Sequence, residues 1–175
     1  ERASKKKAGR DFFLVHCPER VTAGKLLYNL TNLDRILGAA DPKGARRATA
    51  FYRRFVKGAL HVTDWTTAEV AKTAENAYWD VQIAFANEVA LISEELGVDA
   101  YRVRELVNTC PWRSMLLPGA GVGGHCIPKD PWLLISPAFA AKPELIPVAR
   151  EINDYMPKRM AQIVEEALLA TGRRI

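Results

Sequence analysis

The sequence Gly-Ala-Gly-Val-Gly-Gly-His-Cys-Ile-Pro-Lys-Asp-Pro at residues 119–131 constrains this chain more than any other segment. Glycine occupies four of its first six positions, and glycines permit positive φ angles and close approach of other groups. They lead to Cys126, which is followed within four residues by Lys129 and Asp130. A thiol on such a loop, beside a cation and a carboxylate, has the features of a nucleophile.

The same loop contains the spacing of a dinucleotide-binding turn. Residues 119–124 read Gly-x-Gly-x-x-Gly, and Glu144 lies twenty residues beyond the last glycine. Such a turn must follow a strand and open a helix at its third glycine. Pro118 precedes the loop, and Pro128 and Pro131 follow it where a helix would have to run. We therefore reject a dinucleotide-binding turn here.

Three short apolar segments in the first part of the chain, residues 12–16, 36–39 and 60–62, are predicted to be strands. The first reads as a buried strand. A helix is predicted over residues 42–57, with a proline in its first turn and Asp41 as its cap. Together these elements form a small, incomplete sheet with unpaired edges, which predicts that this part is the less stable one.

A long helix is predicted to begin at Thr66 or Thr67, run to Leu96 and end at Gly97. Its apolar residues recur near heptad spacing at Val70, Ala74, Ala77, Val81, Ala84, Ile92 and Leu96, with Phe85, Val89 and Leu91 widening the face. A helix of about 30 residues with that much apolar surface usually buries it against partner helices. The partners can belong to one bundle or to a symmetry mate.

A polar stripe follows the same helix at Glu69, Lys72, Asn76, Asp80 and Asn87. Steps of three, four, four and seven residues place these side chains on one side of a helix. Spacing alone favours a solvent-facing side with ordinary i,i+4 pairs.

Three further helices are predicted over residues 99–107, 144–155 and 157–170. Val103, Leu106 and Val107 form the apolar side of the first. The last has a proline in its first turn, and its inward residues are predicted to be Met160, Ile163, Val164, Ala167 and Leu168. The fold class is therefore mainly α with a small partial parallel β-sheet.

Composition bounds the function classes. A chain of 175 residues that is 49% hydrophobic can bury a real core. No signal peptide and no apolar run of about 20 residues is present, so we expect no membrane partner. Three cysteines argue against a disulfide framework and favour a reducing, cytoplasmic setting. Of the net charge of +5, residues 1–10 carry +4, and no basic stripe interleaved with aromatics follows. We therefore expect no nucleic-acid partner.

A metal module is the first rival interpretation. His16-Cys17 and His125-Cys126 offer four nitrogen and sulfur ligands in two dipeptides. Neighbouring residues on a strand point to opposite faces, which disfavours joint ligation, so no metal is expected.

Three motifs carry a resemblance to a known family. The loop matches Gly-x-Gly-x-Gly-Gly-x-Cys followed by an aspartate, through Gly119, Gly121, Gly123, Gly124, Cys126 and Asp130. Residues 12–21 resemble a strand followed by an Asn-Pro-Glu element, with Cys17 at the asparagine position, and residues 68–78 resemble the start of a long central helix. The chain thus resembles the nucleotide-sugar 6-dehydrogenases, the UDP-glucose/GDP-mannose dehydrogenase family, which oxidise nucleotide sugars to uronic acids with NAD.

The resemblance leaves the sugar open. Gly-Gly-His-Cys-Ile-Pro followed by Asp-Pro-Trp is similar to the branch that acts on UDP-N-acetylmannosamine and related UDP-N-acetylhexosamines. Lys129-Asp130 instead resembles the ending of the UDP-glucose branch. A UDP-N-acetylhexosamine is the favoured substrate class, and UDP-glucose is the alternative.

The resemblance also implies a domain organisation. Residues 1–65 correspond to the C-terminal remnant of a Rossmann NAD-binding domain. Residues 66–175 correspond to the central helical domain, which carries the catalytic cysteine, dimerises through the helix at 66–97 and ends in a linker helix. The Gly-rich NAD site and the C-terminal nucleotide-sugar domain of the family are expected to be absent, so the isolated chain is expected to be inactive. A non-catalytic dimerisation module is the second rival interpretation.

The resemblance assigns roles residue by residue. Two hydride removals convert the C6 alcohol to a carboxylate through an aldehyde, a cysteine thiohemiacetal and a thioester. Cys126 is then the nucleophile, Lys72 and Asn76 stabilise the oxyanion, and Asp130 and Glu19 handle protons and water. Substrate contacts fall on Arg113 (reaching across a dimer), Gly123, Gly124, His125 and Lys129, and NAD contacts on Glu19 and Cys126. His125 is equally compatible with a structural role.

Overall fold

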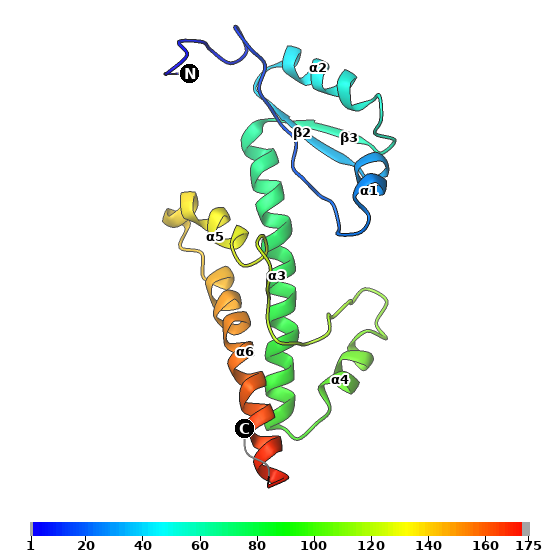
Figure 1. The fold of residues 1–175 in the computed structure, drawn as a ribbon, viewed down its shortest axis with the longest axis vertical. Helices are drawn as coiled ribbons and strands as arrows, with labels where there is room; N and C mark the ends of the chain where they lie inside the picture. The colour runs from blue at the N-terminus through cyan, green and yellow to red at the C-terminus, as the bar shows by residue number, and fades with distance from the viewer. Residues whose placement is uncertain (1, 173–175) are drawn as a thin grey trace. The chain divides into compact units, whose positions relative to one another are not determined.

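A computed structural model describes residues 2–172 of the chain, with the backbone alone at residues 138 and 139 (Figure 1). It contains two compact units, Glu1–Lys72 and Thr73–Ile175. A long helix begins in the first unit and continues into the second. The mainly α architecture with one small sheet is as predicted.

The first unit is built on a three-stranded sheet of β1 (Val15–His16), β2 (Arg35–Ala39) and β3 (Leu60–Thr63), in that order. β2 and β3 pair in parallel, as predicted, whereas β1 pairs with β2 in the antiparallel sense, so the sheet is mixed. Leu37 at the centre of β2 is fully buried. Burial at this position agrees with the apolar run that predicted the strand.

The predicted buried strand over residues 12–16 is wrong except at its last two residues. Phe12 is 36% exposed and Leu14 is 51% exposed. The Leu14 carbonyl accepts a hydrogen bond from the Trp65 indole at 3.0 Å instead of a ladder bond from a strand. The apolar run at residues 12–14 therefore belongs to the connection that leads into β1 and not to the strand itself.

Two helices flank this sheet. The first, α1 (Leu26–Asn32), was not predicted. The second, α2 (Pro42–Tyr52), begins as predicted, because one Asp41 carboxylate oxygen accepts from the N–H groups of Lys43 at 2.9 Å and Gly44 at 2.8 Å. It ends five residues before the predicted boundary.

The early end of α2 follows from the return of the chain to the sheet. The Lys57 N–H donates to the Thr31 carbonyl at 2.7 Å, and Val56 is 4% exposed. Gly58 comes so close to α1's exit that a Cβ there would lie 2.5 Å from the Leu33 carbonyl. A helix continuing to residue 57 could not make these contacts.

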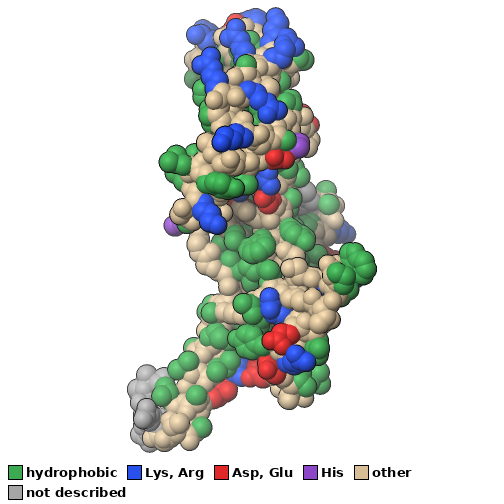
Figure 2. All heavy atoms as spheres, turned by 90° about the vertical axis from the view of Figure 1, so that its right-hand side faces the viewer, with side chains coloured by type: hydrophobic (Ala, Val, Ile, Leu, Met, Phe, Trp, Pro, Cys, Tyr) green, Lys and Arg blue, Asp and Glu red, His purple; other side chains and the backbone are tan. Residues whose placement is uncertain are grey.

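Lys and Arg side chains gather on the first unit (Figure 2). Exposed cations on α2, Lys43, Arg46 and Arg47, add to those of the first ten residues. The Arg47 guanidinium lies 4.7 Å from the centre of the Phe13 ring. The basic character of the chain is therefore concentrated in this unit rather than in its first ten residues alone.

The long helix α3 spans Trp65–Glu95. Its cap is Asp64, not Thr66 or Thr67 as predicted, because the Asp64 carboxylate accepts from the Thr67 N–H at 2.9 Å and from the Thr67 hydroxyl at 2.6 Å. These hydrogen bonds, led by the one from the hydroxyl, lower the pKa of Asp64. Gly97, with a φ of +67°, follows the helix end as predicted.

The second unit adds α4 (Ala100–Val107), α5 (Asp130–Ile135), the 3-10 helix η1 (Ser136–Ala141) and α6 (Leu145–Ala170). α6 runs beside the part of α3 in this unit (Figure 1). α4 is capped by Asp99, whose carboxylate accepts from the Tyr101 N–H at 2.9 Å. Its predicted apolar side is largely exposed, with Leu106 at 54% and Val107 at 37%.

The two helices predicted over 144–155 and 157–170 are one helix, with Pro157 inside it. Proline removes a single helical N–H, and helices tolerate this where packing supports them. Beyond Met156 the predicted inward face is wrong at Ile163, which is 38% exposed, at Val164, which is 55% exposed, and at the exposed Ala167, whereas Met160 and Leu168 are half-buried. No helix among residues 2–172 combines the length and the apolar character needed to cross a bilayer.

The cap of α2 gives a stability prediction. Asp41→Ala removes the acceptor for two N–H groups and is expected to lower the free energy of unfolding by about 1 kcal/mol. Asp41→Asn keeps a good capping side chain and serves as the control, with an expected change of less than about 0.5 kcal/mol. Urea unfolding followed by circular dichroism measures both, and equal losses in the two variants would contradict the capping role.

Candidate active site

Cys126 is exposed on a loop that leads directly into α5. Its carbonyl accepts from the N–H groups of Lys129 at 3.1 Å and Asp130 at 2.8 Å. Gly124 has a φ of +85° and does not open a helix, because the next helix begins at Asp130 with Pro131 in its first turn. The loop thus has neither the preceding strand nor the following helix of a dinucleotide-binding turn.

The carboxylate that follows the cysteine is buried and bound to α3. Asp130 is 7% exposed, and its Oδ2 accepts from the Asn76 side-chain amide at 2.6 Å. Its other oxygen lies 3.9 Å from the ammonium of Lys129, whose side chain is 62% exposed. Lys72 lies one helical turn before Asn76 on α3 and is half-buried. The structure therefore brings Asn76 and Asp130 together, next to the segment that carries Cys126.

The other predicted site residues lie mostly at the surface. Gly123, Gly124 and His125 are exposed. The guanidinium of Arg113 donates to the Trp112 carbonyl at 3.2 Å. Arg113 also lines a groove of about 480 Å³ with Tyr78, Phe85, Met115 and other residues of the second unit. In the first unit, the exposed Glu19 accepts a hydrogen bond from the Val21 N–H.

The three thiols differ in exposure. Cys126 is exposed, whereas Cys17 and Cys110 are half-buried. Burial, together with a hydrogen bond to the Cys17 thiol, raises the pKa of Tyr52 to about 12. Within residues 2–172, no group of three or more His, Cys, Asp or Glu side chains is arranged to hold a metal ion.

The later part of the polar stripe of α3 does not face solvent, which corrects the prediction from spacing there, whereas Glu69 at its start is exposed. Asp80 and Asn87 are fully buried. They meet two buried polar residues of α6, Arg150 at 2% and Asn153 at 1% exposure, which the sequence patterns did not predict. Periodicity places side chains on one side of a helix but does not say which side is covered.

An ion pair and an amide join these helices. The Arg150 guanidinium donates to Asp80 Oδ1 at 2.6 Å and also bonds to Asp154. The Asn153 side-chain amide donates to the Asp80 carbonyl and to Asp80 Oδ1, each at 2.9 Å. α3 and α6 are thus fixed to each other by polar contacts among the buried side chains of Asp80, Arg150 and Asn153.

Comparison with known proteins identifies the family. Residues 66–155 match the central domain of the UDP-glucose/GDP-mannose dehydrogenase family, and residues 1–56 match its NAD binding domain. This chain belongs to the UDP-glucose/GDP-mannose dehydrogenase family.

Individual relatives carry more specific names. The UDP-N-acetyl-D-mannosamine dehydrogenase of Methanocaldococcus jannaschii is 44% identical over 165 residues, which are 93% of this chain and 38% of that protein. The NDP-N-acetyl-D-galactosaminuronic acid dehydrogenase of Ralstonia nicotianae is 44% identical over 157 residues, 90% of this chain and 37% of that protein. The structure of UDP-D-ManNAc dehydrogenase from Pyrococcus horikoshii matches with a TM-score of 0.90 at 44% identity, covering 98% of this chain and 41% of that one. The chain therefore spans about two fifths of the length of these relatives.

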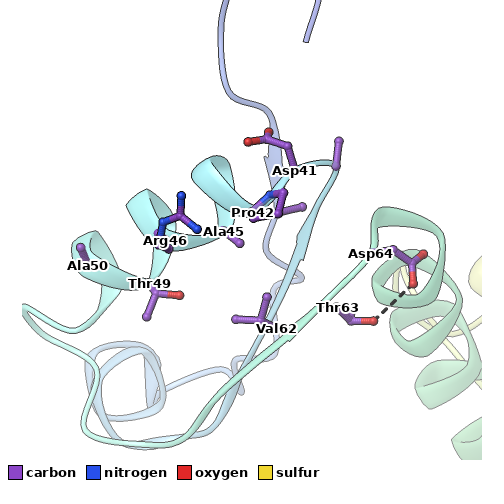
Figure 3. A pocket seen from close by; sticks show the side chains of 11 residues that line it. Asp41, Pro42, Ala45, Arg46, Thr49, Ala50, Val62, Thr63 and Asp64 are labelled. Atoms are coloured by element: carbon purple, nitrogen blue, oxygen red, sulfur yellow. Dashed lines mark hydrogen bonds between the residues drawn. The ribbon is translucent and has the colours of Figure 1, made fainter. Parts of the chain in front are cut away.

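A hollow in the first unit does not provide a phosphate cradle for NAD. A hollow of about 780 Å³ lies beside the start of α2, at the ends of β2 and β3 (Figure 3). Dinucleotide phosphates need free N–H groups at a helix start. Here the Asp41 carboxylate occupies the first N–H groups of α2, and the Asp64 carboxylate occupies that of Thr67 on α3. Carboxylates at both positions would repel a phosphate, so these residues do not fit the pyrophosphate of NAD.

The loop before Cys126 gives a second stability prediction. Gly121 has a φ of +90°, and a Cβ there would lie 2.2 Å from the Asn153 carbonyl oxygen. Gly121→Ala is therefore expected to cost about 3 kcal/mol or more in the free energy of unfolding, or to displace the loop.

Gly123→Ala is the matched control, since its Cβ would meet no atom within 4 Å. Its expected change is within about 0.5 kcal/mol. Guanidinium unfolding of both variants measures the difference. A Gly121→Ala protein as stable as Gly123→Ala, with an unchanged loop, would show that the close approach to α6 is not required.

Proposed function

We propose that this chain supplies the central, cysteine-bearing part of an NAD-dependent nucleotide-sugar 6-dehydrogenase. The reaction is the oxidation of the C6 alcohol of a UDP-sugar to a uronate. The observation that carries the proposal is the Asn76–Asp130 hydrogen bond of 2.6 Å beside an exposed cysteine on a glycine loop. Membership of the dehydrogenase family supports the reaction class.

The chemistry assigned to this chain's residues is covalent catalysis at Cys126. Its thiolate adds to the C6 aldehyde and forms a C–S bond, and the carbonyl oxygen becomes an oxyanion. Lys72 and the second amide proton of Asn76 donate to that oxyanion. When bound, NAD would supply the acceptor for two hydrides, the first lost from the C6 alcohol to give the aldehyde and the second lost from C6 of the thiohemiacetal to give the thioester. Because the hollow beside α2 does not fit its phosphates, we assign no residue of this chain to hydride transfer.

Release of the uronate needs water. A water molecule attacks the thioester carbonyl, the C–S bond breaks, and the thiolate leaves with the bonding electron pair. Asp130 and Glu19 are the proposed acceptors of the proton that the water loses. The exposed loop around Cys126 admits water, and the Asn76 amide holds the Asp130 carboxylate in place for this role.

The favoured substrate is a UDP-N-acetylhexosamine. The names of the Methanocaldococcus, Ralstonia and Pyrococcus relatives support an N-acetylated amino sugar. UDP-glucose remains the alternative because of the Lys129-Asp130 pair. Gly123, Gly124, His125 and Lys129 are the proposed sugar contacts on the loop, with Arg113 contributed by a partner subunit.

The second unit exposes apolar side chains that a homodimer can cover (Figure 2). On α3, Phe85 is 56% exposed, Ile92 is 52% exposed and Leu96, just after it, is 70% exposed. Contiguous exposed apolar surface of this kind marks an interaction site. We propose dimerisation through residues 66–97, in a reducing, cytoplasmic setting that keeps the Cys126 thiol free.

Turnover tests the nucleophile in a chimera in which this chain replaces the matching segment of the Pyrococcus horikoshii relative. The chimera is expected to form NADH with UDP-N-acetylmannosamine, and Cys126→Ser is expected to lower turnover at least about a thousandfold. Cys110→Ser is the control and should leave it unchanged. Wild-type turnover by Cys126→Ser would refute the proposed nucleophile. The chain alone is expected to form no NADH.

The dimer is tested in this chain by sedimentation equilibrium. Phe85→Asp places a charge in the exposed apolar surface of α3 and is expected to weaken dimerisation at least about tenfold. Glu88→Ala, an exposed change on the same helix, should have little effect. A dimer unaffected by Phe85→Asp would argue against this interface. An intact dimer with an inactive chimera would favour the non-catalytic dimerisation module.

A further inference from the structure

The segment that carries Cys126 is fixed before the cysteine as well as after it. The Gly119 N–H donates to Asn87 Oδ1 at 2.8 Å. Two residues later, Gly121 lies against the Asn153 carbonyl, which Pro157 deprives of its usual helical donor. A side-chain oxygen of α3 and a backbone carbonyl of α6 therefore meet the loop five to seven residues before the cysteine.

The anchor after the cysteine uses the same helix. Asn76 holds the Asp130 carboxylate, and the Asp130 N–H holds the Cys126 carbonyl at 2.8 Å. Asn76 and Asn87 are eleven residues apart on α3, which is about three turns and returns to the same face. One face of α3 thus binds the Cys126 segment on both sides of the thiol.

The orientation of the Asn87 amide is set by a buried network. Its Nδ2 donates to Asn153 Oδ1 at 2.9 Å, and Asn153 is in turn held by Asp80. With its nitrogen bound to α6, the amide must present its oxygen to Gly119. An apolar residue at position 87 could fill the same space but would offer no acceptor to that N–H.

The buried polar network of Asp80, Arg150, Asn153 and Asn87 leaves two of its polar atoms without a hydrogen bond within the described part of the chain, so stability alone does not explain it. Asp80 Oδ2 and Arg150 Nε are buried and make no hydrogen bond with any residue that the structure describes. Replacement of buried ion pairs by apolar residues often stabilises a protein. What the polar network adds here is a fixed direction for one amide group.

We propose that Asn87 is a positioning residue for the Cys126 segment, held in place by Asp80, Arg150 and Asn153. It acts through the backbone at Gly119 and does not need to touch substrate. This inference rests on the proposed function for its catalytic meaning, since that function makes Cys126 the nucleophile.

Amide hydrogen exchange, resolved by residue with NMR, tests the proposal in the whole chain. Asn87→Ala is compared with Ser93→Ala, because Ser93 is also buried on α3, at 3% exposure, and its hydroxyl bonds to Val89 of the same helix. The exchange rates of both variants are corrected for their measured free energies of unfolding. If Asn87 had a purely structural role, the corrected exchange rates of the amides around Cys126 would not differ between the two variants.

In Asn87→Ala, the amides of Gly119, Lys129 and Asp130 are expected to exchange about tenfold faster than in Ser93→Ala. Equal corrected rates at all three amides would overturn the proposal. The amides of the central turns of α3 should agree between the two variants after correction.

A second pair of variants acts from the loop, in case Asn87→Ala does not fold. Gly119→Pro removes the N–H donor and leaves the buried residues unchanged. Gly119→Ala keeps the donor, and its Cβ would meet no atom within 4 Å. We expect Gly119→Pro to speed exchange at Lys129 and Asp130 about tenfold and to change the rate of Cys126 alkylation, relative to Cys110, about threefold.

Indistinguishable behaviour of Gly119→Pro and Gly119→Ala would also overturn the proposal. Neither exchange nor alkylation requires turnover. Failure of the proposed function, seen as full activity of Cys126→Ser in the chimera, is therefore distinguishable from failure of this inference.

Discussion

The buried Asp80–Arg150 ion pair is the constraint on which the second unit depends. Its atoms lie 2.6 Å apart, with 0% and 2% of the side chains exposed. Burying two charges costs several kcal/mol for each ion, and only good geometry with further hydrogen bonds offsets that cost. The pair therefore tolerates little change in the spacing of α3 and α6. Asn153, which binds Asp80, and Asn87, which binds Asn153, are held in place by it.

The helices of the second unit hold the segment that carries Cys126, and the loop leaves the thiol exposed. Two side-chain amides of α3, the buried Asn87 and the half-buried Asn76, hold the segment before and after Cys126, while the residues from Gly123 to Cys126 stay exposed. A nucleophile must be held within a fraction of an ångström of its productive position, yet its substrate must reach it. Glycines satisfy both needs, since they allow the backbone to approach α6 at Gly121 and leave space around the thiol.

Sequence patterns predicted the elements whose signals are local. β2, β3 and α3 follow from apolar runs and a long helical period, and Asp41 and Gly97 act as the predicted boundary residues. The Asn76–Asp130 contact links residues that the family resemblance had placed in one site.

The errors arise where tertiary contacts decide. Periodicity placed Asp80 and Asn87 on one side of α3, but only the partners on α6 show that this side is buried. Pro157 is predicted to separate two helices but lies inside α6. It leaves the Asn153 carbonyl without its helical donor, and Gly121 lies against that carbonyl. Leu14 lies in an apolar segment typical of a buried strand, but its carbonyl accepts a hydrogen bond from the Trp65 indole and not from a neighbouring strand.

The most direct measurement is peptide mass spectrometry on the chimera carrying Asp130→Asn, quenched in acid during incubation with NAD and UDP-N-acetylmannosamine. If Asp130 serves hydrolysis and Cys126 carries the acyl group, the peptide containing Cys126 will gain the mass of the nucleotide-sugar uronyl group. NADH formation with every cysteine, Cys126 included, recovered as a free thiol throughout turnover would contradict the account.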